Sequence, residues 1–204
     1  YVLTGSISLS DTLIIEPGVE INMDGFVING GGQLKAIGTK SDSIKFKSED
    51  VSGQINLHGF GSVTLDYCIL NNTKLNLYES NAIIKNSSIL NNKDRMPVGI
   101  SNRSTPKIIS NNFQNNEVAI SCTHSSPSLF NNFFISNKDE MLIASFSASN
   151  PVLKNNIFES NLGGLKFTNC NLIIFNNNIV TNNLIDSFYD ATLYFYRCSG
   201  IILN

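Results

Sequence analysis

Two short charged segments are the parts of the sequence best equipped for chemistry. Lys93-Asp94-Arg95 and Lys138-Asp139-Glu140 each follow an asparagine, and Glu117 lies between them in the chain. Carboxylates are ligands for Ca²⁺, and basic side chains can transfer protons. However, the segments offer one or two carboxylates each, whereas Ca²⁺ takes about six to eight oxygen ligands. The competing interpretation is that these charges only solvate two exposed loops.

The other residues that commonly do chemistry are scattered along the chain. His58 and His124 have no acidic residue at a matching spacing, so a serine–histidine–aspartate site is not indicated. The four cysteines show neither CxxC spacing nor paired histidines, which argues against zinc. Gly30-Gly31-Gly32 precedes a strand-like run and is typical of a turn. The sequence therefore predicts no catalytic residue, no metal and no cofactor, except Ca²⁺ if the charged segments form a cation site.

Composition excludes several classes of function. The 204 residues carry a formal charge of −2, which is unlike the strongly basic surface of a nucleic-acid-binding protein. No apolar run approaches the roughly 18 residues of a membrane-spanning helix, so direct membrane insertion is not expected. Apolar residues make up 42% of the chain, which is enough to form a core.

A sequence repeat of about 22 residues begins near residue 63. This repeat determines where the charged segments and the other candidate residues lie in the fold. Phrases such as ILNN, FQNN and FESN recur, and they use many of the 30 asparagines in the chain. In every copy, isoleucine or phenylalanine lies three residues before the closing asparagine. The closing asparagines are Asn72, Asn92, Asn116, Asn137, Asn161, Asn182 and Asn204.

A repeat of this length predicts a solenoid of short strands. Helix-pair repeats need about 33–47 residues, and the LxxLxL spacing of leucine-rich repeats is absent. Turn signals interrupt β-branched and aromatic runs, as in STP at 104–106, SSP at 125–127 and SNP at 149–151. We therefore predict a parallel β-helix of nine to ten coils, and the family resemblance given below implies a right-handed one. It forms one domain over residues 1–204, with N-terminal coils in 1–62 and seven regular repeats in 63–204.

Asparagine suits such coils for two reasons. It tolerates the left-handed backbone conformation of a tight bend, and its amide can hydrogen-bond to the same amide one coil above. The seven closing asparagines are therefore predicted to form an internal ladder. The cysteines, Cys68, Cys122, Cys170 and Cys198, lie at different distances from these asparagines. We expect them to be free and mostly buried, because no two share a column in adjacent coils under this alignment.

A surface stripe is a second candidate site. Strand alternation should turn the residue seven positions before each closing asparagine outward. An outward row of apolar and basic side chains could stack against sugar rings or dock a partner. The alternative is that a loop or a neighbouring subunit covers these residues, or that they are tolerated surface residues. The stripe contains Leu65, Lys85, Ile109, Phe130, Lys154, Phe175 and Arg197.

The repeat phrases also resemble a known family. SSPSLFNNFFISN at 125–137 and SNPVLKNNIFESN at 149–161 are similar to right-handed parallel β-helix repeats of the pectate-lyase-like superfold. TLIIEPGVEINMDG at 12–25 and GGQLKAIGTKSDSIKFKS at 31–48 resemble the first coils of secreted bacterial β-helix proteins. The resemblance implies secretion or a cell-surface location. Separately, the sequence stops at Asn204 on a predicted ladder position without a capping helix or charged tail. Because the end of a solenoid needs a cap, we expect the chain to be part of a longer protein, which continues or meets a partner at its C-terminal end.

The resemblance leaves the function open, because this superfold includes lyases, hydrolases, adhesins and inert spacers. The first hypothesis is a non-enzymatic module that binds a polysaccharide or a protein of a surface complex. The second is a polysaccharide lyase or hydrolase that acts on an acidic glycan at the charged segments, with Ca²⁺ and a basic residue. The third is a scaffold within a multi-protein assembly.

Overall fold

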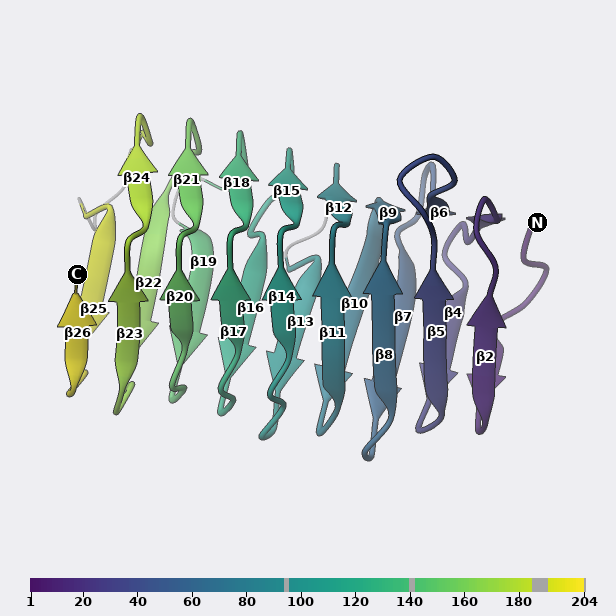
Figure 1. Ribbon diagram of the computed structural model, residues 1–204, viewed down its shortest axis with the longest axis horizontal. Coiled ribbons are helices and arrows are strands. Elements are labelled where there is room, and N and C mark those ends of the chain that lie inside the picture. The colour runs from purple at the N-terminus through teal and green to yellow at the C-terminus, as the bar shows by residue number, and fades with distance from the viewer. Residues whose placement is uncertain (94–95, 140–141, 185–190, 204) are drawn as a thin grey trace.

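The computed structural model describes residues 1–93, 96–139, 142–184 and 191–203. These residues form 26 β-strands, which wind into an elongated solenoid with the two termini at opposite ends (Figure 1). Within the described part of the chain, no helix has the length and apolar character needed to cross a membrane.

Every third strand of the described chain joins the same sheet, which gives three parallel sheets named here after their first strands. The β1 sheet contains β1 (Ile7–Leu9), β4 (Val27–Gly30), β7 (Gly53–His58), β10 (Thr73–Tyr78), β13 (Val98–Ser101), β16 (Ile120–Thr123), β19 (Leu142–Ser147), β22 (Gly164–Thr168) and β25 (Leu193–Tyr196). The β2 sheet contains β2 (Thr12–Ile15), β5 (Gln33–Ile37), β8 (Ser62–Asp66), β11 (Asn81–Lys85), β14 (Lys107–Ile109), β17 (Ser128–Phe130), β20 (Val152–Lys154), β23 (Ile173–Asn176) and β26 (Ile201–Leu203). The β3 sheet contains β3 (Glu20–Asn22), β6 (Ile44–Lys47), β9 (Cys68–Asn71), β12 (Ser88–Leu90), β15 (Asn112–Gln114), β18 (Phe133–Ile135), β21 (Ile157–Glu159) and β24 (Ile179–Thr181).

The coils are close to the predicted length. In the β1 sheet, eight register steps lead from Ile7 to Leu193, so one coil uses about 23 residues. The described strands number nine in two sheets and eight in the third, so the upper end of the predicted coil count is slightly high. The prediction of an all-β parallel solenoid is confirmed.

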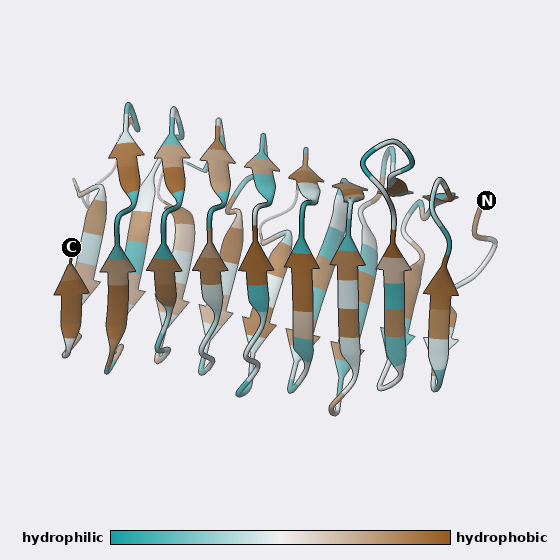
Figure 2. Cartoon of the chain, viewed as in Figure 1, coloured by the Kyte–Doolittle hydropathy of each residue, from teal (hydrophilic) through white to brown (hydrophobic). Residues whose placement is uncertain are grey.

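The core fills the space between the three sheets. Apolar and polar residues alternate along the strands, as the bands in Figure 2 show, and the apolar ones point inward. Because coils stack in register, equivalent phenylalanines lie above one another with ring centroids 4.5–5.2 Å apart. Two such stacks run through the core, and they are Phe113–Phe134–Phe158 and Phe146–Phe167–Phe195.

Each corner of a regular coil combines an outward bend with an inward polar or thiol side chain. At the β2–β3 corner, where the chain passes from the β2 sheet to the β3 sheet, the bend residue has positive φ, as in Asn86 and Asn131. Asparagine enters this region at lower cost than most residues. The next residue points inward, and this column contains Cys68, Ser87, Asn111, Asn132, Asn156 and Asn178.

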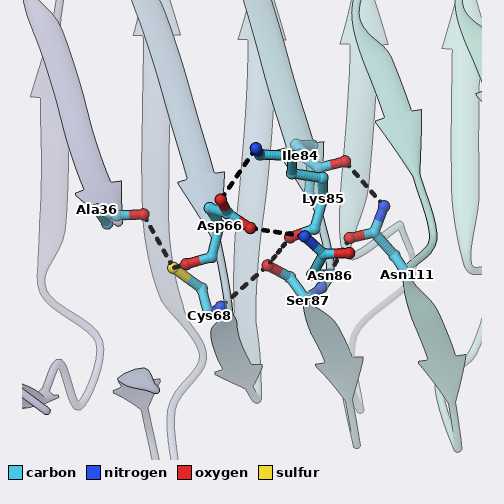
Figure 3. A network of polar contacts seen from close by, with 8 residues as sticks. All are labelled: Ala36, Asp66, Cys68, Ile84, Lys85, Asn86, Ser87 and Asn111. Carbon is cyan, nitrogen blue, oxygen red and sulfur yellow. Dashed lines mark hydrogen bonds and ion pairs between the residues drawn. The ribbon is translucent and has the colours of Figure 1, made fainter. Parts of the chain in front are cut away.

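Hydrogen bonds run along this column from coil to coil (Figure 3). The Cys68 N–H donates to Ser87 Oγ at 3.0 Å, and the Ser87 N–H donates to Asn111 Oδ1 at 3.0 Å. Asn111 Nδ2 in turn donates to Asn132 Oδ1 and to the carbonyl of Ile84. The column therefore satisfies backbone groups that the bend removes from the sheets.

The predicted ladder lies at the β3–β1 corner, where the chain passes from the β3 sheet to the β1 sheet. Asn92, Asn116, Asn137 and Asn161 are buried, and each Nδ2 donates to the Oδ1 of the next member at 2.8–3.1 Å. The fifth member is Asn183. The predicted ladder is therefore confirmed for Asn92, Asn116, Asn137 and Asn161.

Two other predicted members are wrong, and Asn204 lies outside the described residues. Asn72 and Asn182 have positive φ and form the bend itself, so Thr73 and Asn183 occupy the inward position. Each belongs to an Asn-Asn pair, and either asparagine of such a pair can serve as the bend. Asn72 is still buried, and it accepts a hydrogen bond from Ser52 Oγ at 2.9 Å.

The β1–β2 corner, where the chain passes from the β1 sheet to the β2 sheet, has an inward column that the sequence did not predict. The Ser80 N–H donates to Ser104 Oγ, and the Ser125 N–H donates to Ser149 Oγ. The last three of these serines begin the STP, SSP and SNP turn signals, so the signal is present in the sequence but indicates only a turn there. Cys170 continues the column in the next coil.

The cysteines of the described chain are free, as predicted, and Cys68, Cys122 and Cys170 are buried. The expectation that no two share a column in adjacent coils is wrong. Thr168 pairs with Tyr196, which places Cys170 and Cys198 at equivalent positions of neighbouring coils. The prediction failed because this coil is longer than the assumed 22 residues, with Leu165 paired to Leu193.

Burial of the thiols predicts a loss of stability at alkaline pH. Desolvation raises the pKa of Cys68 and of Cys122 to about 12, from an ordinary value of 9.0. Since the folded thiols keep their protons when unfolded ones ionise, this stabilisation is complete below about pH 9 and is lost as pH rises toward 12. We expect urea unfolding to show a falling free energy of unfolding from pH 9 to 11. A Cys68→Ala/Cys122→Ala chain should lose less over this interval, and an equal loss would contradict the prediction.

Candidate functional site

The outward orientation predicted for the surface stripe is confirmed in its central part. Lys85, Ile109, Phe130 and Lys154 are register partners in successive strands of the β2 sheet, and their side chains face outward. The first of these cations is paired, because Lys85 Nζ lies 3.0 Å from Asp66 Oδ2 (Figure 3). The stripe is therefore a short row of mixed apolar and basic character.

The prediction is wrong for the residues at the two ends of the stripe. Leu65 and Phe175 are buried in the core, and Asp66 and Asn176 take the outward positions beside Lys85 and Lys154. This one-residue shift has the same origin as the errors at Asn72 and Asn182. Arg197 follows β25 of the β1 sheet, so it belongs to a different face of the solenoid.

The charged segments lie at the β3–β1 corner, as the repeat predicts. Lys93, Glu117 and Lys138 each follow a ladder asparagine, and backbone hydrogen bonds connect their coils. Asp139 is buried and accepts a hydrogen bond from the Leu142 N–H at 3.0 Å, so it stabilises its own loop. Asp94, Arg95 and Glu140 lie outside the described residues. In the part of the chain that is described, no group of three or more His, Cys, Asp or Glu side chains could hold a metal ion.

The outer face of the β1 sheet, called the β1 face here, carries the more extensive polar surface. Two parallel columns of outward side chains run along it, and most of them are small or carry a hydroxyl or amide. One column contains Asn56, Asn76, Gly99, Ser121, Ser145, Lys166 and Tyr194. The other contains His58, Tyr78, Ser101, Thr123, Ser147, Thr168 and Tyr196.

At the C-terminal end of the β1 face, tyrosines and hydroxyl groups surround a cavity of about 550 Å³. Lys166 Nζ lies 5.7 Å from the centroid of the Tyr194 ring, and Arg197 Cζ lies 5.1 Å from that of Tyr196. Such cation–π contacts favour this arrangement of the rings and the cations. The lining residues are Ser145, Ser147, Lys166, Thr168, Tyr194 and Tyr196.

A second cavity of about 330 Å³ lies further toward the N-terminus on the same face. Tyr78 and Met96 line it, together with Gly99 and Ser121. A Cβ atom on Gly99 would lie 2.7 Å from Asn76 Oδ1, so a larger residue there would displace the end of the asparagine side chain. The result is a depression lined mainly by apolar atoms, with Tyr78 and Met96 among its lining residues.

The rim of the β1 face at the β1–β2 corner holds a further group of titratable side chains. Glu79, Asn102, Arg103 and His124 line a cavity of about 290 Å³, and all four have positive φ. Glu79 and His124 therefore line the same cavity. Sequence spacing did not indicate this shared lining, because two coils separate Glu79 from His124.

Sequence reasoning missed the β1 face as a whole. Its residues alternate with core residues in phrases such as ISCT at 120–123 and GLKFT at 164–168, which share only their final threonine. The only available signal was the tyrosine pair at 194 and 196, spaced to face the same side of a strand. The face offers hydroxyl and amide groups for hydrogen bonding, aromatic rings for stacking and a few cations.

Comparison with known proteins agrees with this architecture. A search of curated proteins finds no match to the chain. A family model described as right handed beta helix region matches residues 53–202, which is well over half of the sequence. The match covers the regular repeats and the strands that form both cavities of the β1 face. The chain therefore belongs to the right handed beta helix family.

Proposed function

We propose that the chain is a non-enzymatic β-helix module that binds a polysaccharide along the β1 face, outside the cell. The observation that carries this proposal is the C-terminal cavity, where Tyr194, Tyr196 and Lys166 stand beside three hydroxyl side chains. The resemblance of the first coils to secreted bacterial proteins supports the extracellular location. A protein released from the cell or exposed on it should be found in the medium or be sensitive to external protease.

The chemistry of the cavity suits a sugar. Tyrosine rings present an apolar face that can stack on the C–H face of a pyranose, and their hydroxyls reach polar partners. Ser145, Ser147 and Thr168 can each donate and accept hydrogen bonds with sugar hydroxyls. The backbone that carries each of these groups is fixed, because each stands on a strand that is paired in register.

The shape of the face suits a linear polymer. From Tyr78 on β10 to Tyr196 on β25, five strand spacings cover about 24 Å. Outward side chains repeat at the strand spacing, so a chain laid along the solenoid axis meets similar groups at regular intervals. The depression at Gly99 lies on this path and gives the polymer room near the sheet.

Replacing both tyrosines tests the proposal. A Tyr194→Ala/Tyr196→Ala chain should bind its polysaccharide at least tenfold more weakly, because two stacking surfaces are removed. The measurement is affinity electrophoresis against a panel of bacterial and plant polysaccharides, followed by calorimetric titration of the polymer that retards the native chain.

The matched control is Tyr194→Phe/Tyr196→Phe, which keeps the rings and should retain most of the affinity. Phe130→Ala removes an aromatic side chain from the outer face of the β2 sheet instead and should leave the affinity for the polysaccharide unchanged. If Phe130→Ala weakens binding while the double alanine chain does not, the stripe on the β2 sheet is the binding surface and the β1 face is not.

A second candidate function is a polysaccharide lyase or hydrolase. The cavity at Glu79, Arg103 and His124 favours it, because acid–base groups lie at the rim of the same face. The test is incubation of the chain with acidic polysaccharides, with and without Ca²⁺, while new reducing ends and the ultraviolet absorbance of unsaturated products are recorded. Turnover that disappears in His124→Ala would replace the binding proposal with this one.

A further inference from the structure

The inward column at the β1–β2 corner ends in two cysteines in the described chain. Ser149 lies one coil before Cys170, and Cys198 lies one coil after it. We propose that Cys170 and Cys198 form a disulfide bond under oxidising conditions, which fastens the coil of β25 to the coil of β22. This inference is independent of the proposed function.

The backbone places the two residues side by side. Thr168 pairs with Tyr196 at the ends of β22 and β25, and the Asn169 N–H donates to the Tyr196 carbonyl at 2.8 Å. Beyond the cysteines, the Ser199 N–H donates to the Cys170 carbonyl at 2.9 Å. Neighbouring strands lie about 4.8 Å apart, which falls within the roughly 4.4–6.8 Å range of Cα separations in disulfides.

The side chains have the same orientation. Cys170 Sγ lies 3.5 Å from the carbonyl of Thr168, and Cys198 Sγ lies 3.4 Å from the carbonyl of Tyr196. Ser149 Oγ, one coil earlier, likewise bonds to the carbonyl two residues before it. Both sulfur atoms therefore continue the inward column, one above the other, and the bond needs no strand to move out of the sheet.

Neither of the other two cysteines is close enough to Cys170 or Cys198 to form a disulfide bond with it. Cys122 lies on β16, two strands from β22, which corresponds to about 9.6 Å between backbones. This exceeds the limit of about 7 Å for a disulfide. Cys68 lies on β9 in the β3 sheet, many coils away. Of the four cysteines, Cys170 and Cys198 are the pair that the fold brings together.

The reaction requires a small-molecule disulfide such as oxidised glutathione. Cys198 is half-buried, so its thiolate attacks one sulfur of the oxidant and releases the first glutathione thiolate. The Cys170 thiolate then attacks the Cys198 sulfur of this mixed disulfide and releases the second. Two thiols become one disulfide, the oxidant is reduced to two thiols, and the two protein protons pass to the solvent or the leaving groups. Because burial raises the pKa of Cys170, the second step should accelerate as pH rises.

The test is oxidation of the folded chain with oxidised glutathione, followed by thiol blocking, trypsin digestion without reductant and mass spectrometry. Trypsin cleaves after Lys166 and Arg197, so the two cysteines fall on different peptides. We expect these peptides to appear joined in most molecules, and two of the four thiols to disappear. Cys68→Ser should leave the linked pair intact, whereas Cys198→Ser should abolish it.

Three outcomes would overturn the inference. The first is a stable glutathione adduct on Cys198 without a Cys170 link, and the second is a link from either residue to Cys122. The third is a link that forms only in urea. A parallel far-UV circular dichroism spectrum of each variant shows that the chain remains folded, so that a missing link reports on geometry.

Discussion

Replacing Phe134 with alanine is expected to lower the free energy of unfolding by about 3–5 kcal/mol. Phe134 is fully buried, and its ring stacks on Phe113 and Phe158 with centroids 4.6 and 4.5 Å away. Removing it leaves a cavity that the neighbouring rings cannot fill, because each is held by its own strand. Urea unfolding followed by circular dichroism measures the change.

The adjacent Phe133 provides a matched control. Its side chain is 45% exposed on the outer face of the β3 sheet, so Phe133→Ala removes the same atoms from the surface. We expect a loss of less than about 1 kcal/mol for this variant, and an intermediate loss for Phe134→Leu. Equal losses for Phe133→Ala and Phe134→Ala would show that the stack does not stabilise the solenoid.

Replacing Asn137 with alanine should cost a comparable amount, about 3–5 kcal/mol, through hydrogen bonding. Asn137 Oδ1 accepts from the N–H and Nδ2 of Asn116, and its Nδ2 donates to Asn161 Oδ1 and to the Phe113 carbonyl. All of these groups are buried, so the alanine chain leaves donors and acceptors on both neighbouring coils without partners.

Asn171→Ala is the control for the asparagine change, because Asn171 is exposed and should tolerate substitution within about 0.5 kcal/mol. The same urea titration compares the two variants. A loss below about 1 kcal/mol for Asn137→Ala would mean that the side-chain hydrogen bonds of the ladder contribute little to the free energy of unfolding.

These two positions also show how much a sequence repeat reveals by itself. Phe134 and Asn137 recur at a fixed separation, which identified one inward column and one ladder correctly in the central copies. The alignment slipped at Asn72 and Asn182, where two asparagines stand together. Bend and ladder positions both accept asparagine, so composition cannot tell them apart. Backbone register decides which residue points inward, and a slip of one turns every neighbouring side chain to the other face.

The candidate site was less accessible to sequence reasoning. The β1 face joins Lys166 on β22 with Tyr194 on β25, and the intervening coil is longer than the others. Its floor consists of serine, threonine and glycine, which are common in turns and carry no distinctive pattern. The rim at Glu79 and His124 likewise depends on which coils stack directly above one another.

The sequence by itself determined the class of fold, because a repeat of about 22 residues with alternating apolar positions can bury its core only by stacking coils. It also determined that asparagine would line the interior of a corner. Only the tertiary structure decided the phase of each coil, and with it the outward residues, the β1 face and the pairing of Cys170 with Cys198. The physical reason is that hydrogen bonds between coils set the register. Strands stay paired even where a coil has extra residues, as between Leu165 and Leu193. A fixed repeat length in the sequence cannot locate the inward residues of such a coil.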